Sequence, residues 1–337
     1  MKITKIITGL MVLTVVLTGC AASEKSKESS AAESQTQPTE AQSTEKAADT
    51  VAAGQKEGDR RVVEHAMGTT EIEGTPLRVV TLFQGATDSA LLLGVTPLGA
   101  VESWAEKPVY EYLRGQMDGV VNLGIEIQPN LEEIIALKPD LIIASKVRHE
   151  KIYSQLNEIA PTVMVKEVYQ WKDTLNICAK ALNKEEEAEE FFTKWDEKTA
   201  YFKEKAADKI KNTKVAVIDF RADHARIVYT GFAATVLDDM GIERPESHKK
   251  DEWGIMLQSE EAIPQMEADL IFDQTNLNEA ENVTNRDKWI SNPLWSNLTA
   301  VKNNQVYPVN SVFWNSGGGP QAAMHMLEEV YKFYGVE

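Results

Sequence analysis

Two arginines that follow apolar, strand-like segments are the residues of this sequence best suited to bind a small ligand. Arg148 lies just beyond Leu141-Ile142-Ile143-Ala144, and Arg221 directly follows the segment that ends at Phe220. A guanidinium group recognises anionic oxygens through two parallel, charge-assisted hydrogen bonds. Ligands of open α/β sheets bind beyond the carboxyl ends of the strands. We therefore expect the two arginines to clamp an anionic ligand; the alternative is that both are surface residues paired with neighbouring carboxylates.

Aromatic side chains near strand ends could form the apolar walls of such a pocket. Trp104 and Trp314 follow predicted strands and are the first candidates, and Tyr229 and Trp253 are further ones. Arg226, in a possible hairpin that leads to Tyr229, is a weaker candidate for contact with the ligand. The remaining tryptophans of the second half are expected to pack in the core: Trp195, Trp289 and Trp295.

Catalytic and nucleic-acid functions have little support in the sequence. It has no glycine-rich phosphate loop, no Gly-x-Ser-x-Gly and no His-Glu-x-x-His, and its five histidines are scattered. The formal net charge of −17 argues against nucleic acid as a partner. We expect no enzymatic activity, no cofactor and no metal site. A surface enzyme that uses the same pocket is the alternative of another class.

The N-terminus predicts an exported lipoprotein. Basic residues precede the apolar run Ile6–Leu17, which leads into Leu17-Thr18-Gly19-Cys20. This is a signal peptide with a lipobox, too short for a membrane span, and Cys20 would be cleaved and acylated (palmitate). The alternative is a plain secretory signal with a chance cysteine. The protein is thus expected at the extracytoplasmic face of the cell membrane, held by its lipid.

Composition and periodicity divide the chain into five parts. Residues 21–59 are polar and contain hardly a large apolar side chain, which indicates a flexible linker. Strands alternating with helices then predict doubly wound parallel sheets on both sides of a helical stretch. The expected parts are a signal peptide (1–19), an acylated linker (20–59), an N-terminal α/β lobe (60–170), a helical bridge (171–211) and a C-terminal α/β lobe (212–337).

An internal repeat supports two similar lobes. Asn130–Ile143 aligns without a gap with Ser259–Phe272, and each segment begins with an N-cap residue and ends with Asp before an apolar strand. Chance similarity between two ordinary helix-to-strand units is the alternative. From the repeat we infer two lobes, at about 78–170 and 212–337, joined by a long helix.

These features resemble the substrate-binding lipoproteins of ABC importers for ferric siderophores, haem and cobalamin. The resemblance covers residues 60–337 and is carried by several motifs in order: the lipobox, Arg78-Val79-Val80, Asn130–Ala144, Gly241–Pro245, Ser259–Phe272, and Trp314-Asn315 before Gly317-Gly318-Gly319. It implies a clamshell with a helical backbone, that is, two Rossmann-like lobes joined by a single long α-helix, with the ligand in the cleft between them. It also implies lobes that close by only a few degrees.

The resemblance also implies a ligand, a partner and their residues. A ferric siderophore, whose oxygens arginine can satisfy, is the expected ligand, and haem or cobalamin is the alternative; His149 and His224, beside the arginines, could ligate haem. Glu132 and Glu261 match the family's paired glutamates that dock on the permease, although Glu133 or Glu260 could serve instead, or both could simply favour a helix N-terminus. A monomer is expected. The preferred siderophore class stays open.

Overall fold

The computed structural model describes residues 60–336, which all belong to one compact unit, Gln55–Glu337. The expected signal peptide, the lipidation site at Cys20 and the linker lie outside the described residues. Within the described part, none of the helices combines the length and the apolar character needed to cross a bilayer.

The first half is built on a five-stranded parallel sheet in the order β5-β4-β3-β8-β9. Its central strands are buried, as parallel strands covered on both faces must be. The strands of this sheet are β3 (Val79–Thr81), β4 (Gly99–Ala100), β5 (Val121–Asn122), β8 (Leu141–Ser145) and β9 (Thr162–Val165). Its helices are α1 (Gln84–Leu92), η1 (Glu111–Gln116), α2 (Leu131–Leu137), α3 (Lys146–His149), η2 (Glu150–Ile152) and α4 (Tyr153–Ile159).

Two small antiparallel hairpins complete this half, and the sequence analysis missed both. The strands of the first are β1 (Arg60–His65) and β2 (Gly68–Glu73), and those of the second are β6 (Gly124–Ile125) and β7 (Gln128–Pro129). The turn between β6 and β7 carries Glu126, which becomes important below.

The second half is built on a mixed sheet in the order β12-β11-β10-β13-β14. The expectation of a wholly parallel sheet is wrong here, because β10 turns directly into β11 and β11 pairs antiparallel with β10 and β12. The strands are β10 (Val215–Phe220), β11 (Ala225–Val228), β12 (Gly254–Leu257), β13 (Leu270–Asp273) and β14 (Val306–Pro308). The helices are α8 (Phe232–Asp239), η3 (Glu246–His248), η4 (Glu260–Met266), α9 (Ala280–Ile290), η5 (Trp295–Asn297), α10 (Thr299–Lys302), η6 (Val312–Ser316) and α11 (Pro320–Tyr334).

The repeated segments adopt equivalent positions with one difference. Asn130 caps α2 and Ser259 caps η4, each by accepting a backbone N–H two residues later. The first segment is an α-helix, whereas the second is a 3₁₀ helix that contains Pro264. Proline has no N–H and disfavours the α conformation of the residue before it. Each segment leads into a strand that pairs in parallel with the first strand of its sheet along the chain, β8 with β3 and β13 with β10.

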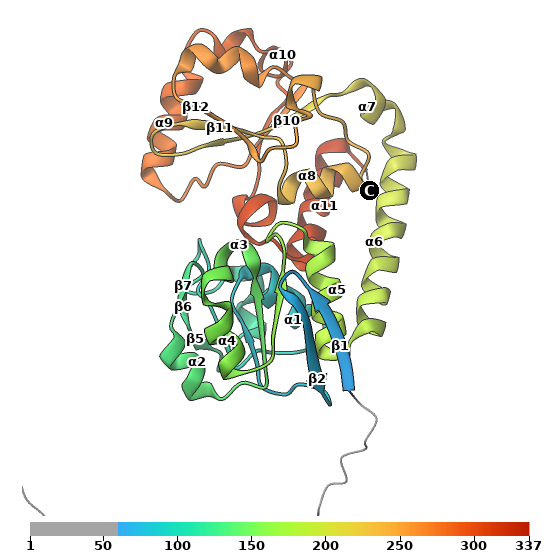
Figure 1. Cartoon of the computed structure of the whole chain (residues 1–337). Coiled ribbons are helices and arrows are strands. Elements are labelled where there is room, and N and C mark those ends of the chain that lie inside the picture. Colours follow the sequence, from blue (N-terminus) through green and yellow to red (C-terminus); the bar gives the residue numbers. More distant parts are fainter. Residues whose placement is uncertain (1–59, 337) are drawn as a thin grey trace, which may run out of the picture. The chain divides into compact units, whose positions relative to one another are not determined.

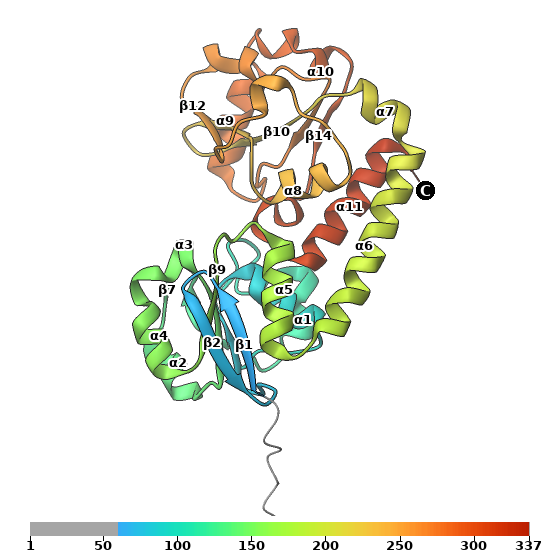
Figure 2. The ribbon, with the colours of Figure 1, turned by 45° about the vertical axis from the view of Figure 1, so that its right-hand side comes forward.

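Three consecutive helices connect the two sheets: α5 (Trp171–Leu182), α6 (Glu185–Lys205) and α7 (Ala207–Asn212). Figures 1 and 2 show α6 running alongside both halves. Its 21 residues span roughly 30 Å at 1.5 Å per residue. Trp195 of α6 is fully buried against Trp171 of α5, with ring centroids 4.8 Å apart. Trp195, Trp289 and Trp295 are all buried, as expected of packing residues.

The last helix, α11, forms a second connection between the halves, because it packs against α1 of the first half and against the connecting helix α5 (Figure 2). Asp88 of α1 is fully buried and accepts hydrogen bonds from the backbone N–H groups of Gln321 and Ala322, at 2.8 and 3.2 Å. The Tyr112 hydroxyl donates to the same carboxylate at 2.7 Å. Asp88 therefore caps a helix that lies more than two hundred residues further along the chain. Burial raises its pKa to about 6, although these hydrogen bonds oppose the shift.

Candidate ligand-binding site

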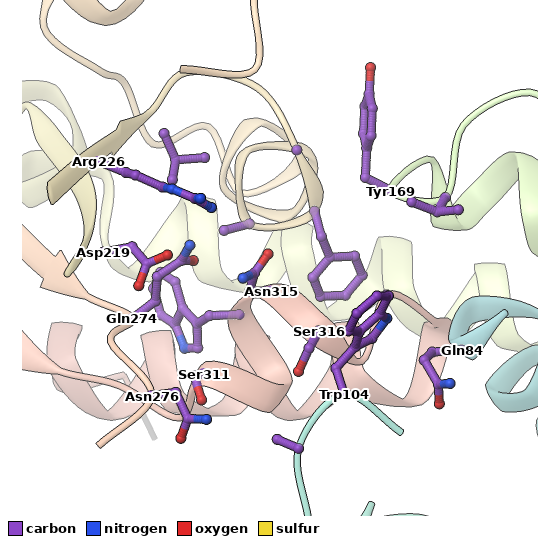
Figure 3. A pocket seen from close by; sticks show the side chains of 18 of the residues that line it. Gln84, Trp104, Tyr169, Asp219, Arg226, Gln274, Asn276, Ser311, Asn315 and Ser316 are labelled. Atoms are coloured by element: carbon purple, nitrogen blue, oxygen red, sulfur yellow. The ribbon is translucent and has the colours of Figure 1, made fainter. Parts of the chain in front are cut away.

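A cavity of about 640 Å³ lies between the two sheets and is lined by residues from both. This volume falls within the range of roughly 300–1,000 Å³ that is usual for small-molecule sites. Its residues follow the carboxyl ends of parallel strands, including β3, β8 and β13. Figure 3 shows Trp104 and Gln84 of the first half on the opposite side from Asp219, Gln274 and Asn276 of the second.

The wall of the first half centres on the buried carboxylate of Glu126, in the turn between β6 and β7. Its Oε1 accepts a hydrogen bond from Arg148 Nε at 3.1 Å, and its Oε2 accepts one from Trp104 Nε1 at 3.1 Å. The Arg148 guanidinium also lies over the Trp104 ring, 5.9 Å from its centroid. Trp104 is 47% exposed and Glu126 only 3%. The buried acid thus holds a partly exposed arginine and tryptophan at the cavity.

The wall of the second half repeats this pairing of arginine with a buried acid. Arg221 Nε donates to Asp219 Oδ2 at 2.7 Å, and Asp219 is 1% exposed. Arg226, the second residue of β11, places its guanidinium 5.4 Å from the centroid of Trp253, which is 49% exposed. Burial raises the pKa of Asp219, and the charge of Arg221 opposes this shift.

Arg148 and Arg221 keep their terminal nitrogens available for a ligand. Each is held through Nε alone, and within residues 60–336 no group accepts a hydrogen bond from their Nη atoms. Their side chains are 35% and 32% exposed. Such a guanidinium can present its two Nη groups to a pair of anionic oxygens. The cavity is not uniformly positive, however, because four carboxylates also line it: Glu126, Asp219, Glu279 and Glu281.

Of the aromatic candidates, the structure brings three to the cavity and leaves one outside. Trp104, Trp253 and Trp314 line it, and Trp314 does so from a fully buried position with its Nε1–H donating to Glu329 at 2.6 Å. Tyr229 is not among the lining residues, which corrects the expectation from sequence. It is 3% exposed and packs in the core of the second half, with its ring 5.6 Å from that of His248. A strand-end aromatic next to a pocket residue can still point inward to the core.

The two histidines beside the arginines already use both ring nitrogens. His149 is fully buried, its Nδ1 accepts the Ser145 backbone N–H, and its Nε2 therefore donates to the Glu126 carbonyl at 2.7 Å. Burial lowers the pKa of His149, which favours this neutral form. His224 Nε2 accepts from Arg226 Nε at 2.8 Å, and its Nδ1 lies 2.6 Å from Asp223 Oδ1. Neither imidazole has a nitrogen left to ligate haem iron in this arrangement.

The paired glutamates lie on the surface at equivalent ends of the repeated segments. Glu132 is in the first turn of α2 and Glu261 in the first turn of η4, and both are exposed. Their neighbours differ, since Glu260 forms an ion pair with Lys288 while Glu133 is exposed. Of these two neighbouring glutamates in the second half, Glu261 is therefore the one without an ion-pair partner in the described part of the chain.

Sequence reasoning missed the acids that hold the arginines. Asp219 stands two residues before Arg221 near the end of an apolar strand, so its unusual place in that strand was a usable signal. Glu126 is 22 residues from Arg148, and nothing in the sequence indicates their contact. Several amide and hydroxyl side chains that line the cavity were missed as well: Gln84, Gln274, Asn276, Ser311, Asn315 and Ser316.

The chain belongs to the periplasmic binding protein family, whose model matches residues 79–312. It is similar to the probable siderophore-binding lipoprotein YfiY of Bacillus subtilis, with 41% identity over 81% of this chain and 87% of the relative. It is also 38% identical to the achromobactin-binding periplasmic protein of Dickeya dadantii, over 77% of this chain and 87% of that protein.

A solved structure supports the same fold. The crystal structure of Staphylococcus aureus SirA complexed with staphyloferrin B superposes with a TM-score of 0.79 at 45% sequence identity. The match covers 82% of this chain and 99% of that one. The expected two-lobed α/β architecture is thereby confirmed.

Proposed function

We propose that this chain is the extracytoplasmic solute-binding component of an ABC importer and that it captures a ferric siderophore for delivery to the permease. The observation that carries the proposal is a pair of arginines, one from each half, that line one cavity and whose Nη groups have no acceptor within residues 60–336. Capture is reversible and non-covalent, since guanidinium forks bind the anionic oxygens around the iron.

The relatives support the same ligand class. YfiY is described as a probable siderophore-binding lipoprotein, and the SirA crystal contains staphyloferrin B. Haem is the less favoured alternative because His149 and His224 are fully engaged in hydrogen bonds. The family consists of binding proteins, which favours transport over turnover.

Tryptophan fluorescence tests the proposal directly, because Trp104 and Trp253 are half-exposed at the cavity. We expect saturable quenching on titration with a ferric siderophore, and none with haem or cobalamin under the same conditions. Hydroxamate, catecholate and citrate-based ferric complexes are titrated in parallel, and the iron-free chelators serve as controls. Saturation by haem or cobalamin alone, or chemical turnover of any of these compounds, would contradict the proposal.

The proposal includes attachment to the membrane surface. Cleavage of residues 1–19 as a signal peptide and acylation of Cys20 would leave residues 20–59 as the tether of a monomer. Two acyl chains are sufficient for stable anchoring, whereas one is marginal. The description of YfiY as a lipoprotein supports this arrangement.

Glu132 and Glu261 are proposed to dock on the permease, one from each half. Both are exposed and occupy equivalent helix starts, which suits recognition by a two-fold transporter with basic residues. Changing both to alanine is expected to abolish siderophore uptake by cells while the purified protein binds its ligand with unchanged affinity. Uptake of radioactive iron as the siderophore complex measures the first, and fluorescence titration the second.

The neighbouring pair provides a matched control for this experiment. Glu133 and Glu260 have the same charge and adjacent positions, so their double alanine variant should retain uptake. Normal uptake by the Glu132/Glu261 double variant, at a normal amount of protein in the membrane, would rule out the docking role.

A further inference from the structure

Glu126 is a buried acid in a cavity proposed to bind an anion, and its presence there needs an explanation. Its charge repels an anionic ligand, and burial raises the pKa of its carboxyl group. A neutral or apolar residue would avoid both costs. The carboxylate must therefore serve a purpose other than direct attraction of the ligand.

The contacts of Glu126 show what it can do. Its two oxygens accept from three parts of the wall: Arg148 Nε at 3.1 Å, Trp104 Nε1 at 3.1 Å and the backbone N–H of Gln84 at 3.4 Å. All three donors belong to residues that line the cavity, and they follow three different strands, β8, β4 and β3. The Glu126 side chain thus connects, through hydrogen bonds, three segments that line the cavity in the first half.

Glu126 is itself held in place through its backbone. The His149 imidazole donates to the Glu126 carbonyl at 2.7 Å and accepts the Ser145 N–H at 3.2 Å, which fastens the β6–β7 turn to the end of β8. Because β8 also leads to Arg148, the acid and the arginine share one rigid support. An arginine held at Nε retains its two Nη groups for the ligand, whereas a freely rotating one must be ordered on binding.

We propose that Glu126 is the positioning residue of the ligand site in the first half, where it orients the Arg148 guanidinium and the Trp104 indole toward the ligand before the ligand arrives. This inference rests on the proposed function. It assigns to Glu126 a role that acts through its neighbours, without contact with the iron complex.

The substitution Glu126→Gln separates positioning from simple charge, because the two roles predict opposite signs. Arg148 and Trp104 donate to different oxygens of Glu126, so in glutamine one of these donors would face the amide NH2 group, which cannot accept a hydrogen bond. If Glu126 positions these groups, affinity for the ferric siderophore falls by roughly ten- to a hundredfold. If it acts only as a negative charge in the cavity, its removal strengthens the binding of an anion.

Glu281→Gln is the charge-matched control. Glu281 lines the same cavity and is exposed, and no residue within 60–336 forms an ion pair with it. Its neutralisation should tighten binding of the anionic complex slightly. Weaker binding by Glu126→Gln together with tighter binding by Glu281→Gln supports the proposal; tighter binding by both overturns it. If the wild-type protein binds no ferric siderophore, the proposed function fails instead.

A pH profile supplies a readout that a merely structural role would not move. The ionisable groups near Glu126 are Arg148, His149, whose pKa burial lowers, and Tyr110, whose pKa burial raises. Because burial raises the pKa of Glu126, falling pH protonates this carboxylate and weakens its hold on Arg148. The affinity advantage of wild type over Glu126→Gln should therefore shrink toward nothing as the pH falls. Taking this ratio at each pH cancels the protonation of the siderophore itself.

Trp104→Phe provides a second test, which on its own does not require the Glu126→Gln variant and which in combination with that variant measures the coupling of the two residues. This variant removes the indole donor but leaves the Glu126 to Arg148 contact intact. If Glu126 acts by positioning, Trp104→Phe weakens ligand binding. The loss of affinity caused by Glu126→Gln should then be smaller in the Trp104→Phe background than in the wild-type protein. Additive losses would mean that the two residues act independently, which would overturn the proposal.

Discussion

Replacing Arg148 and Arg221 together with glutamine is expected to weaken ferric-siderophore binding by roughly a hundredfold to ten-thousandfold. A hydrogen bond to a charged group contributes about 1.5–3 kcal/mol, and about 1.4 kcal/mol corresponds to a tenfold change in Kd. The two arginines are held by separate buried acids in different halves of the molecule, so replacing one should leave the other in position. Each single variant is thus expected to lose roughly ten- to a hundredfold, measured by fluorescence titration.

Lysine is not expected to rescue either position. The side chains of Arg148 and Arg221 contact the buried acid with Nε and leave both Nη groups for the ligand, whereas an ammonium group cannot do both at once. Arg114→Gln is the matched control, because Arg114 is exposed and does not line the cavity. If the double glutamine variant binds within about twofold of wild type, a change below roughly 0.5 kcal/mol, the assignment of the pocket is wrong.

Gly319→Ala is expected to lower the free energy of unfolding by about 3 kcal/mol or more, because a methyl group has no space at this position. An added Cβ would lie 2.3 Å from Asp88 Cβ and 2.4 Å from Asp88 Cγ, far inside van der Waals contact. The backbone of Gly319, with φ −123° and ψ 177°, suits any residue, so the clash alone sets the cost. Displacing Asp88 also removes the cap from α11.

Chemical denaturation measures this loss, and ligand titration should show a second effect. The segment η6, which precedes Gly319, supplies Asn315 and Ser316 to the cavity, so a shifted junction should weaken binding as well. Gly115→Ala is the control, because an added Cβ there meets no atom within 4 Å and its φ is not positive. Equal stability of the two alanine variants would contradict the packing described at Asp88.

The sequence predicted residues that line the cavity better than it predicted the contacts that hold them in place. Arg148 and Arg221 were found because both follow strongly apolar strands, and parallel strands place such positions at one edge of a sheet. Tyr229 also follows a strand, but β11 pairs antiparallel in a mixed sheet and this side chain turns into the core. The direction of pairing is a tertiary property that local periodicity does not contain.

The contacts between distant segments were likewise beyond the sequence. Glu126 lies in a two-residue turn without a periodic pattern, and its partner Arg148 is on another element. Asp88 reads as a polar position in a short apolar helix, yet it caps α11 from 233 residues away. Such contacts depend on how the two sheets are packed together. The repeat and the long helix predicted two connected lobes but not the contacts between them.

The packing of α11 between the two halves has a consequence for ligand binding. Because α11 contacts α1, α5 and α6, the two sheets are joined along a broad packed seam as well as through the chain that links them. A packed connection of this kind lowers the ordering cost that binding a ligand would otherwise incur. Differences in affinity among iron chelates are then expected mainly in their dissociation rates, that is, in how long each chelate stays bound.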